Sequence, residues 1–179
     1  MDIFEKLDAF NIETPSWGYA DTGTRFGKFL QPAAASTIEE KLQDAGVVHR
    51  HTGCCPTVAV HVLWDFKAGV DPKSVAKIAG ANGVSIGSIN PNLFQDQAYK
   101  FGSVCSPDPS ARKAADDHVQ SCIEIGQAVG SNLLSLWFAD GTNYPGQGDI
   151  IARKRLMAEA LQKWHSWMPT DMTMAAITR

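Results

Sequence analysis

Residues 136–147 read LWFADGTNYPGQ, so that an apolar run passes directly into a loop with an acid, two amides, a proline and two glycines. A short apolar run that ends in turn-forming residues is typical of a buried strand. In α/β proteins, binding and catalytic residues gather at the carboxyl ends of parallel strands. The stretch therefore predicts a strand followed by a βα loop at a functional edge.

The same change between apolar and polar segments recurs along the chain. Apolar runs too short for helices predict strands at residues 57–63, 84–89, 132–138 and 172–177. A helical pattern precedes each strand. Ser36 to Glu39 is interpreted as a capping box, and Asp71 and Asp108 each stand before a proline, as residues that cap a helix often do. A last helical stripe runs from Ala152 to Trp167.

Strands that alternate with helices pair in parallel, because right-handed crossovers lay each helix back on the twisted sheet. The sequence therefore predicts an α/β fold with about four βα units. Two architectures fit this pattern: a small open sheet with helices on both faces, and part of a (β/α)8 TIM barrel. A complete barrel takes ~250 residues, whereas this chain has 179.

The composition argues against several classes of partner. The formal net charge is −3 and there is no basic run, so we expect binding neither to nucleic acid nor to an anionic membrane. No apolar run approaches the ~20 residues that span a bilayer, and residues 1–6 lack the pattern of a signal peptide. We therefore expect a cytoplasmic protein. The cysteines lack the spacing of a metal knuckle and are interpreted as reduced thiols.

Several side chains that could bind a ligand lie where the predicted strands end. His61 and Trp64 close the first strand; a histidine in an apolar strand is more often a core residue, but its place near the carboxyl end favours function. Trp137 and the next residue must face opposite sides of the sheet, so one of them belongs to the core. Phe94 lies in a long loop, which is typical of binding and interface segments and also of solvated ones. Asp140 either caps its turn or takes part in chemistry.

Five segments together resemble the bacterial L-rhamnose isomerase family of the broad-specificity type, whose members are relatives of xylose isomerase. The segments are Glu13–Gly18, Gly23–Phe26, Val60–Asp65, Asn92–Asp96 and Leu136–Gln147. The resemblance implies part of a metal-dependent (β/α)8 barrel, with residues 1–55 as an amino-terminal helical extension and first helix, and residues 56–179 as the first half of the barrel. It also implies an aldose–ketose sugar isomerase that acts on a monosaccharide such as L-rhamnose.

The resemblance further implies roles for four residues. His61 would hydrogen-bond the sugar near its reactive end, and Trp64 and Trp137 would form apolar walls of the pocket. Phe94 is similar to a residue that family members lend to the pocket of a neighbouring subunit, so a homo-oligomer with the Phe94 loop at its interface is expected. The family uses Mn²⁺ or another divalent ion to polarise the sugar carbonyl.

The chain also departs from the family pattern. Val62–Leu63 replaces Ile-Pro, and Ile177 stands where the family has the glutamate that bridges its metals. The remaining metal ligands of the family come from the second half of the barrel. We therefore expect a chain truncated before the metal ligands, with no metal bound by this chain alone and no catalysis by it alone. The alternative hypothesis is a non-catalytic sugar-binding or assembly module of α/β type.

Overall fold

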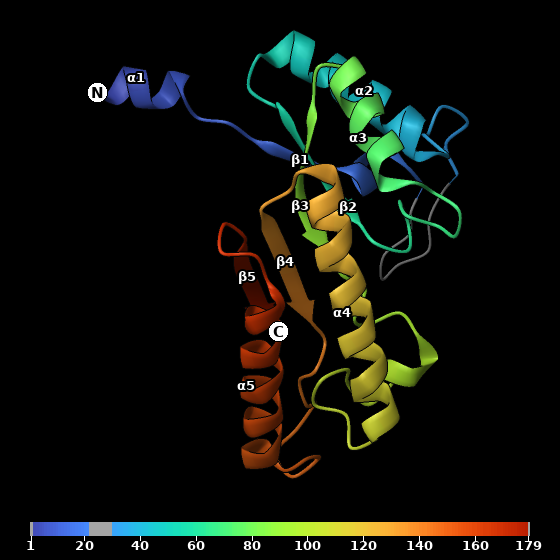
Figure 1. Cartoon of the computed structure of the whole chain (residues 1–179), viewed down its shortest axis with the longest axis vertical. Coiled ribbons are helices and arrows are strands. Elements are labelled where there is room, and N and C mark those ends of the chain that lie inside the picture. The colour runs from blue at the N-terminus through green and yellow to red at the C-terminus, as the bar shows by residue number, and fades with distance from the viewer. Residues whose placement is uncertain (1, 22–29, 179) are drawn as a thin grey trace. The chain divides into compact units, whose positions relative to one another are not determined.

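The computed structural model describes residues 2–21 and 30–178. Helices and strands alternate along the chain (Figure 1). The strands are β1 (Glu13–Pro15), β2 (Thr57–His61), β3 (Ser85–Asn90), β4 (Leu133–Phe138) and β5 (Thr173–Thr178). The α-helices are α1 (Ile3–Asp8), α2 (Ile38–Thr52), α3 (Pro72–Ala81), α4 (Pro109–Val129) and α5 (Ile150–Trp167), and the 3-10 helices are η1 (Ser16–Tyr19) and η2 (Gln97–Tyr99). Within these described residues, no helix is both long and apolar enough to cross a membrane.

The topology is that of successive βα units. The strand order β1-β2-β3-β4-β5 is the order along the chain, and a helix separates each strand from the next. This confirms the α/β class and the partial (β/α)8 type predicted from the sequence. The chain divides into two compact units, Met1–Ser88 and Ile89–Arg179, and β3 contributes residues to both.

The first unit contains a strand that the sequence analysis did not predict. β1 pairs in parallel with β2, with Glu13 opposite Thr57 and Pro15 opposite Ala59. Its three residues include a proline and have no apolar alternation, so only the long-range pairing with β2 makes them a strand. The four predicted strands are therefore five, and β1 rather than β2 opens the first βα unit.

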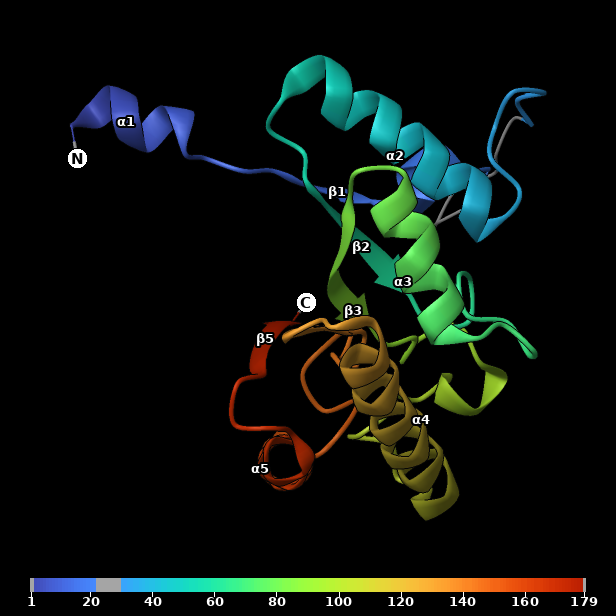
Figure 2. The ribbon, with the colours of Figure 1, turned by 45° about the horizontal axis from the view of Figure 1, so that its top comes forward.

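Helices α2 and α3 of the first unit run beside the strands β2 and β3 (Figure 2). Leu42 of α2 and Val75 of α3 are buried, as are Val58 and Val60 of β2. The capping box of α2 lies one residue later than predicted, because Thr37 and not Ser36 is the N-cap and Glu40 is its partner. The Glu40 carboxylate accepts bonds from the backbone N–H groups of Ser36 and Thr37, which hold its pKa below the ordinary value.

Two glycines in these helices provide a matched test of their packing. A Cβ on Gly46 would lie 2.5 Å from the backbone oxygen of Asn82, at the end of α3, whereas a Cβ on Gly80 would have no neighbour within 4 Å. We expect Gly46→Ala to lower the free energy of unfolding by about 1–3 kcal/mol through overpacking, and Gly80→Ala to raise it by about 0.5–1 kcal/mol through helix propensity. Urea denaturation measures both changes, and equal values would contradict the packing described.

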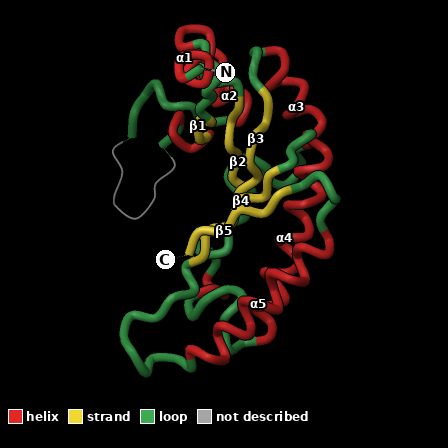
Figure 3. The backbone as a smooth tube through the Cα atoms, turned by 90° about the vertical axis from the view of Figure 1, so that its left-hand side faces the viewer, coloured by secondary structure: helices red, strands yellow, loops and turns green. Residues whose placement is uncertain are grey.

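The second unit is built on β4 and β5, which pair in parallel from Leu133 opposite Thr173 to Phe138 opposite Thr178. Helices α4 and α5 lie on the same side of these strands (Figure 3). Phe138 is buried on that side and stacks on Trp164 of α5, with ring centroids 6.1 Å apart. Trp137 is only half-buried. The expectation that Phe138 and Trp137 take opposite faces, one of them in the core, is thus confirmed.

Candidate functional site

The segment after β2 has an unusual backbone. Leu63 has a φ of 88°, in the left-handed region that side chains other than glycine rarely adopt. The backbone N–H groups of Trp64 and Asp65 both donate to the carbonyl oxygen of His61, at 3.1 and 3.0 Å, which closes a tight turn around Leu63. Strain of this kind persists only where surrounding contacts hold it, and it is concentrated at functional sites.

Three aromatic rings come together at this turn. The rings of His61 and Trp64 are stacked, with centroids 3.6 Å apart and planes at 15°. Trp17 of η1 meets both of them edge-on, at 5.9 Å from His61 and 6.0 Å from Trp64. Trp17 and Trp64 are half-buried, whereas His61 is 4% exposed. Most of the accessible surface of this cluster therefore belongs to the two tryptophans.

The contacts of His61 define its tautomer. Nδ1 lies 3.0 Å from the carbonyl oxygen of Val62, and because a carbonyl can only accept, Nδ1 carries the proton. In the neutral ring, Nε2 is then the acceptor.

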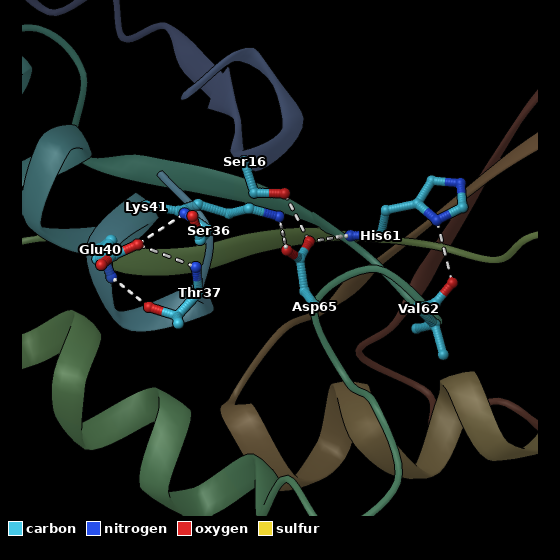
Figure 4. Close-up of polar contacts among 8 residues, drawn as sticks. All are labelled: Ser16, Ser36, Thr37, Glu40, Lys41, His61, Val62 and Asp65. Atoms are coloured by element: carbon cyan, nitrogen blue, oxygen red, sulfur yellow. Dashed lines mark hydrogen bonds and ion pairs between the residues drawn. The ribbon is translucent and has the colours of Figure 1, made fainter. Parts of the chain in front are cut away.

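The buried carboxylate of Asp65 contacts Ser16, Lys41 and the backbone of His61 (Figure 4). It accepts hydrogen bonds from Ser16 Oγ at 2.5 Å, from the His61 N–H at 2.8 Å and from Lys41 Nζ at 2.7 Å. The Lys41 and Asp65 side chains are 3% and 0% exposed, so this ion pair is shielded from water. Trp17, Ser16, Lys41 and Asp65 were not among the predicted site residues.

The other two predicted residues meet in the second unit. The rings of Phe94 and Trp137 form an edge-to-face pair with centroids 4.8 Å apart. Phe94 therefore contacts a ring of its own chain, and its expected place in the pocket of a neighbouring subunit stays a prediction. Asn92, which is buried, fixes the loop: its Oδ1 accepts from the Gln95 N–H at 3.0 Å. Its own N–H donates to His118 Nε2 at 2.9 Å.

The bond between Asn92 and His118 makes this loop sensitive to acid. His118 must be neutral to accept at Nε2, and burial lowers its pKa below the ordinary value of 6.5. The stability that it contributes is fully present above pH 6.5 and is lost as the pH falls through the lower pKa of the folded state. We expect His118→Gln, which keeps an acceptor but does not titrate, to lose less stability on acidification. Urea denaturation above pH 6.5 and below the pKa of folded His118 measures the loss of stability in each protein. Equal losses in the wild type and in His118→Gln would contradict the prediction.

The loop after β4 contributes to a cleft of about 470 Å³ in the second unit. The carboxylate of Asp140 accepts from the Ser103 N–H at 2.6 Å and from the Cys105 N–H at 2.9 Å. These bonds fasten the loop before α4 to the end of β4, which is a structural contact different from the cap of its own turn considered for Asp140. A part of Asp140 in chemistry stays a prediction. Cys105 also lines the cleft, but burial raises its thiol pKa to about 11, so it remains protonated near neutral pH.

A divalent ion needs several oxygen or imidazole ligands from neighbouring side chains. In residues 2–21 and 30–178, no group of three or more His, Cys, Asp or Glu side chains is placed so that it could hold a metal ion. A catalytic ion with several oxygen or imidazole ligands therefore does not fit the described part of the chain. The site present is aromatic and polar, and it is suited to holding a hydroxylated ligand.

The chain is similar in sequence to two probable sugar isomerases and in fold to a solved epimerase. No family model matches the chain. It is 33% identical over 171 residues to a probable sugar isomerase of Rhizobium meliloti, covering 93% of this chain and 39% of that protein. It is 34% identical over 174 residues to a probable sugar isomerase of Mesorhizobium japonicum, covering 94% and 40%. A solved L-ribulose 3-epimerase matches 92% of this chain and 48% of its own, with a TM-score of 0.64 and 14% identity.

These matches differ in what they show. The chain is similar to sugar isomerases over nearly its whole length, and it spans about 40% of the length of those relatives. The epimerase, at 14% identity, shows the fold alone. Similarity to sugar isomerases is what the sequence led us to expect, while the restriction to L-rhamnose is not part of these findings.

Proposed function

We propose that this chain is the sugar-contacting part of an aldose–ketose isomerase of the L-rhamnose type. The observation that carries the proposal is the stacked pair of His61 and Trp64 on a strained turn at the carboxyl end of a parallel strand. In folds with parallel sheets, ligands bind at this end of the strands. The similarity to two sugar isomerases supports a sugar as the ligand.

Each residue has a distinct part in this proposal. The indole of Trp64, with Trp17 beside it, offers an apolar face to the C–H groups of the sugar and excludes water from its hydroxyls. His61 hydrogen-bonds a hydroxyl near the reactive end of the sugar through Nε2. Trp137, with Phe94 against its ring, offers an apolar face of the same kind in the second unit.

Catalysis would need groups beyond those described. A divalent ion, Mn²⁺ in the family that the chain resembles, would supply the charge that polarises a carbonyl. Because the described residues do not assemble ligands for such an ion, the proposal assigns sugar contact to this chain and assigns no catalytic residue. The same observation favours a second candidate, a non-catalytic sugar-binding or assembly module. Both candidates predict that this chain alone does not isomerise L-rhamnose with added Mn²⁺, and clear turnover in that assay would contradict both.

Sugar binding can be tested on the indole N–H signals in NMR spectra of the chain. The chain has five tryptophans. L-Rhamnose should shift the signals of Trp17 and Trp64, while those of Trp164 and Trp167 on α5 should stay in place. We expect Trp64→Ala to weaken binding by about 2- to 10-fold, the effect of an aromatic contact worth 0.5–1.5 kcal/mol.

Trp167→Ala is the matched control, because it also removes a half-buried indole but lies on α5, which is not part of the aromatic cluster. It should leave the affinity for L-rhamnose unchanged. Absence of any sugar-induced shift of the Trp17 and Trp64 signals at saturating sugar would overturn the proposal, and so would an equal loss of affinity in both variants.

A further inference from the structure

The three rings of the aromatic cluster, those of Trp17, His61 and Trp64, belong to segments that are far apart in the sequence. Trp17 belongs to η1, whereas His61 and Trp64 flank the turn after β2. Each ring belongs to, or is next in sequence to, either Asp65 or a residue that donates a hydrogen bond to the Asp65 carboxylate. Ser16 precedes Trp17, the His61 N–H belongs to the imidazole residue itself, and Asp65 follows Trp64. The rings therefore share a single polar attachment.

Resting on the function proposed above, we propose that Asp65 is a positioning residue that sets the arrangement of the sugar-contacting rings of Trp17, His61 and Trp64. Both of its carboxylate oxygens are used. Oδ2 accepts from Ser16 Oγ and from the His61 N–H, and Oδ1 accepts from Lys41 Nζ. An acceptor of three donors from three segments determines where each segment lies.

The chemistry of this attachment leaves little freedom. Ser16, Lys41 and the His61 N–H are all donors, so the side chain between them must offer an acceptor at each of its two terminal atoms. An ionised carboxylate does so, because both of its oxygens only accept. Lys41 of α2 neutralises its charge and stays buried for that reason. The bond from the His61 N–H to Asp65 also spans the turn that contains Leu63 at positive φ, and so holds the strained backbone in place.

Asp65 acts through other residues, since its side chain is 0% exposed and cannot reach a ligand itself. In Asp65→Asn one carboxylate oxygen is replaced by an NH₂ group, which is a donor. This group would face Lys41 or the His61 N–H, which are donors too, so no hydrogen bond can form between them. Whichever way the amide turns, at least one of the bonds to Ser16, Lys41 or the His61 N–H is lost. The segment released should carry its ring with it, while the other unit of the chain keeps its structure.

The test compares Asp65→Asn with Asp117→Asn in the intact chain. Asp117 is a matched control, because its carboxylate also pairs with a lysine, Lys113, but both side chains are exposed on α4. We expect Asp65→Asn to move the indole N–H signals of Trp17 and Trp64 and the ring signals of His61, and to weaken L-rhamnose binding about tenfold or more. Asp117→Asn should change neither readout.

A milder variant keeps the proposal open to refutation if Asp65→Asn does not fold. Ser16→Ala removes one neutral donor and leaves the ion pair intact, so it should shift mainly the Trp17 signal and weaken binding by less. A role of Asp65 in stability alone would lower the melting temperature without moving the ring signals of the folded chain, and that result would overturn the proposal. If the wild-type chain fails to bind L-rhamnose, the proposed function fails, whereas the ring signals still decide the role of Asp65.

Discussion

Replacing Trp164 by alanine is expected to lower the free energy of unfolding by about 3–5 kcal/mol, the usual cost of removing a large aromatic side chain from a core. Trp164 is 0% exposed, so none of its surface is hydrated in the folded chain. Its ring stacks on Phe138 of β4 and thereby fastens α5 to the strand that carries Trp137. Alanine would leave a cavity between helix and strand that neither can fill without moving.

A polar contact adds to this cost. The Nε1–H of Trp164 donates to Asp116 Oδ1 at 2.7 Å, which ties α5 to α4. The other oxygen of Asp116 accepts from Lys163 Nζ at 2.6 Å, so the carboxylate keeps one partner when the indole is removed. Trp164→Phe separates the two contributions, because it retains most of the ring and loses the hydrogen bond. It should cost about 1–3 kcal/mol, chiefly from the bond to a charged acceptor.

Trp167→Ala on the same helix is the control for this experiment. Trp167 is half-buried, so its removal creates no enclosed cavity, and we expect a loss well below that of Trp164→Ala. Chemical denaturation monitored by circular dichroism gives the free energies. Similar losses for the two alanine variants would show that Trp164 is not the core contact between α5 and β4.

The elements predicted best from the sequence are those with strong local signals. Asp71 and Asp108 cap α3 and α4 as their place before proline predicted, because capping bonds join residues two or three apart. The capping box of α2 was misplaced by one residue, since Ser36, Thr37, Glu39 and Glu40 offer two overlapping pairs of the same type. Strand β1 was missed because its signal is not local: a three-residue segment with a proline becomes a strand only by pairing with β2.

The residues of the candidate site also divide into those with a local sequence signal and those placed by long-range contacts. His61, Trp64, Phe94 and Trp137 could be selected from the sequence because each is an aromatic ring at a strand end or in the loop that follows one. The structure brings them together as the pairs His61–Trp64 and Phe94–Trp137. Trp17 follows the strand that was missed, and so its place beside His61 could not be derived.

The groups that support the site left no pattern in the sequence at all. Lys41 follows two glutamates on a helix and is indistinguishable there from a solvated charge, yet it is 3% exposed. Its burial depends on a carboxylate that lies 24 residues away along the chain. Recognition of such a pair requires the tertiary structure, because burial of one charge is tolerated only when the other is already in place.

Because Lys41 and Asp65 are buried as a pair, removal of one charge should strongly destabilise the chain. Replacing Lys41 by methionine is expected to lower the free energy of unfolding by about 3–5 kcal/mol, because it leaves the carboxylate of Asp65 buried without a counter-charge. Methionine fills much of the volume of the lysine chain, so the loss arises from charge and not from a cavity. Ser16 and the His61 N–H still donate to Asp65, but neither neutralises it.

The double variant Lys41→Met/Asp65→Asn tests this cause. With both charges removed, the buried site is neutral, and the double variant should be more stable than Lys41→Met alone even though it carries one more substitution. Lys113→Met, which breaks a pair whose side chains are 74% and 62% exposed, should cost less than about 0.5 kcal/mol. If the two losses simply add in the double variant, the charges of Lys41 and Asp65 are not coupled, and the loss in Lys41→Met does not come from an unpaired buried carboxylate.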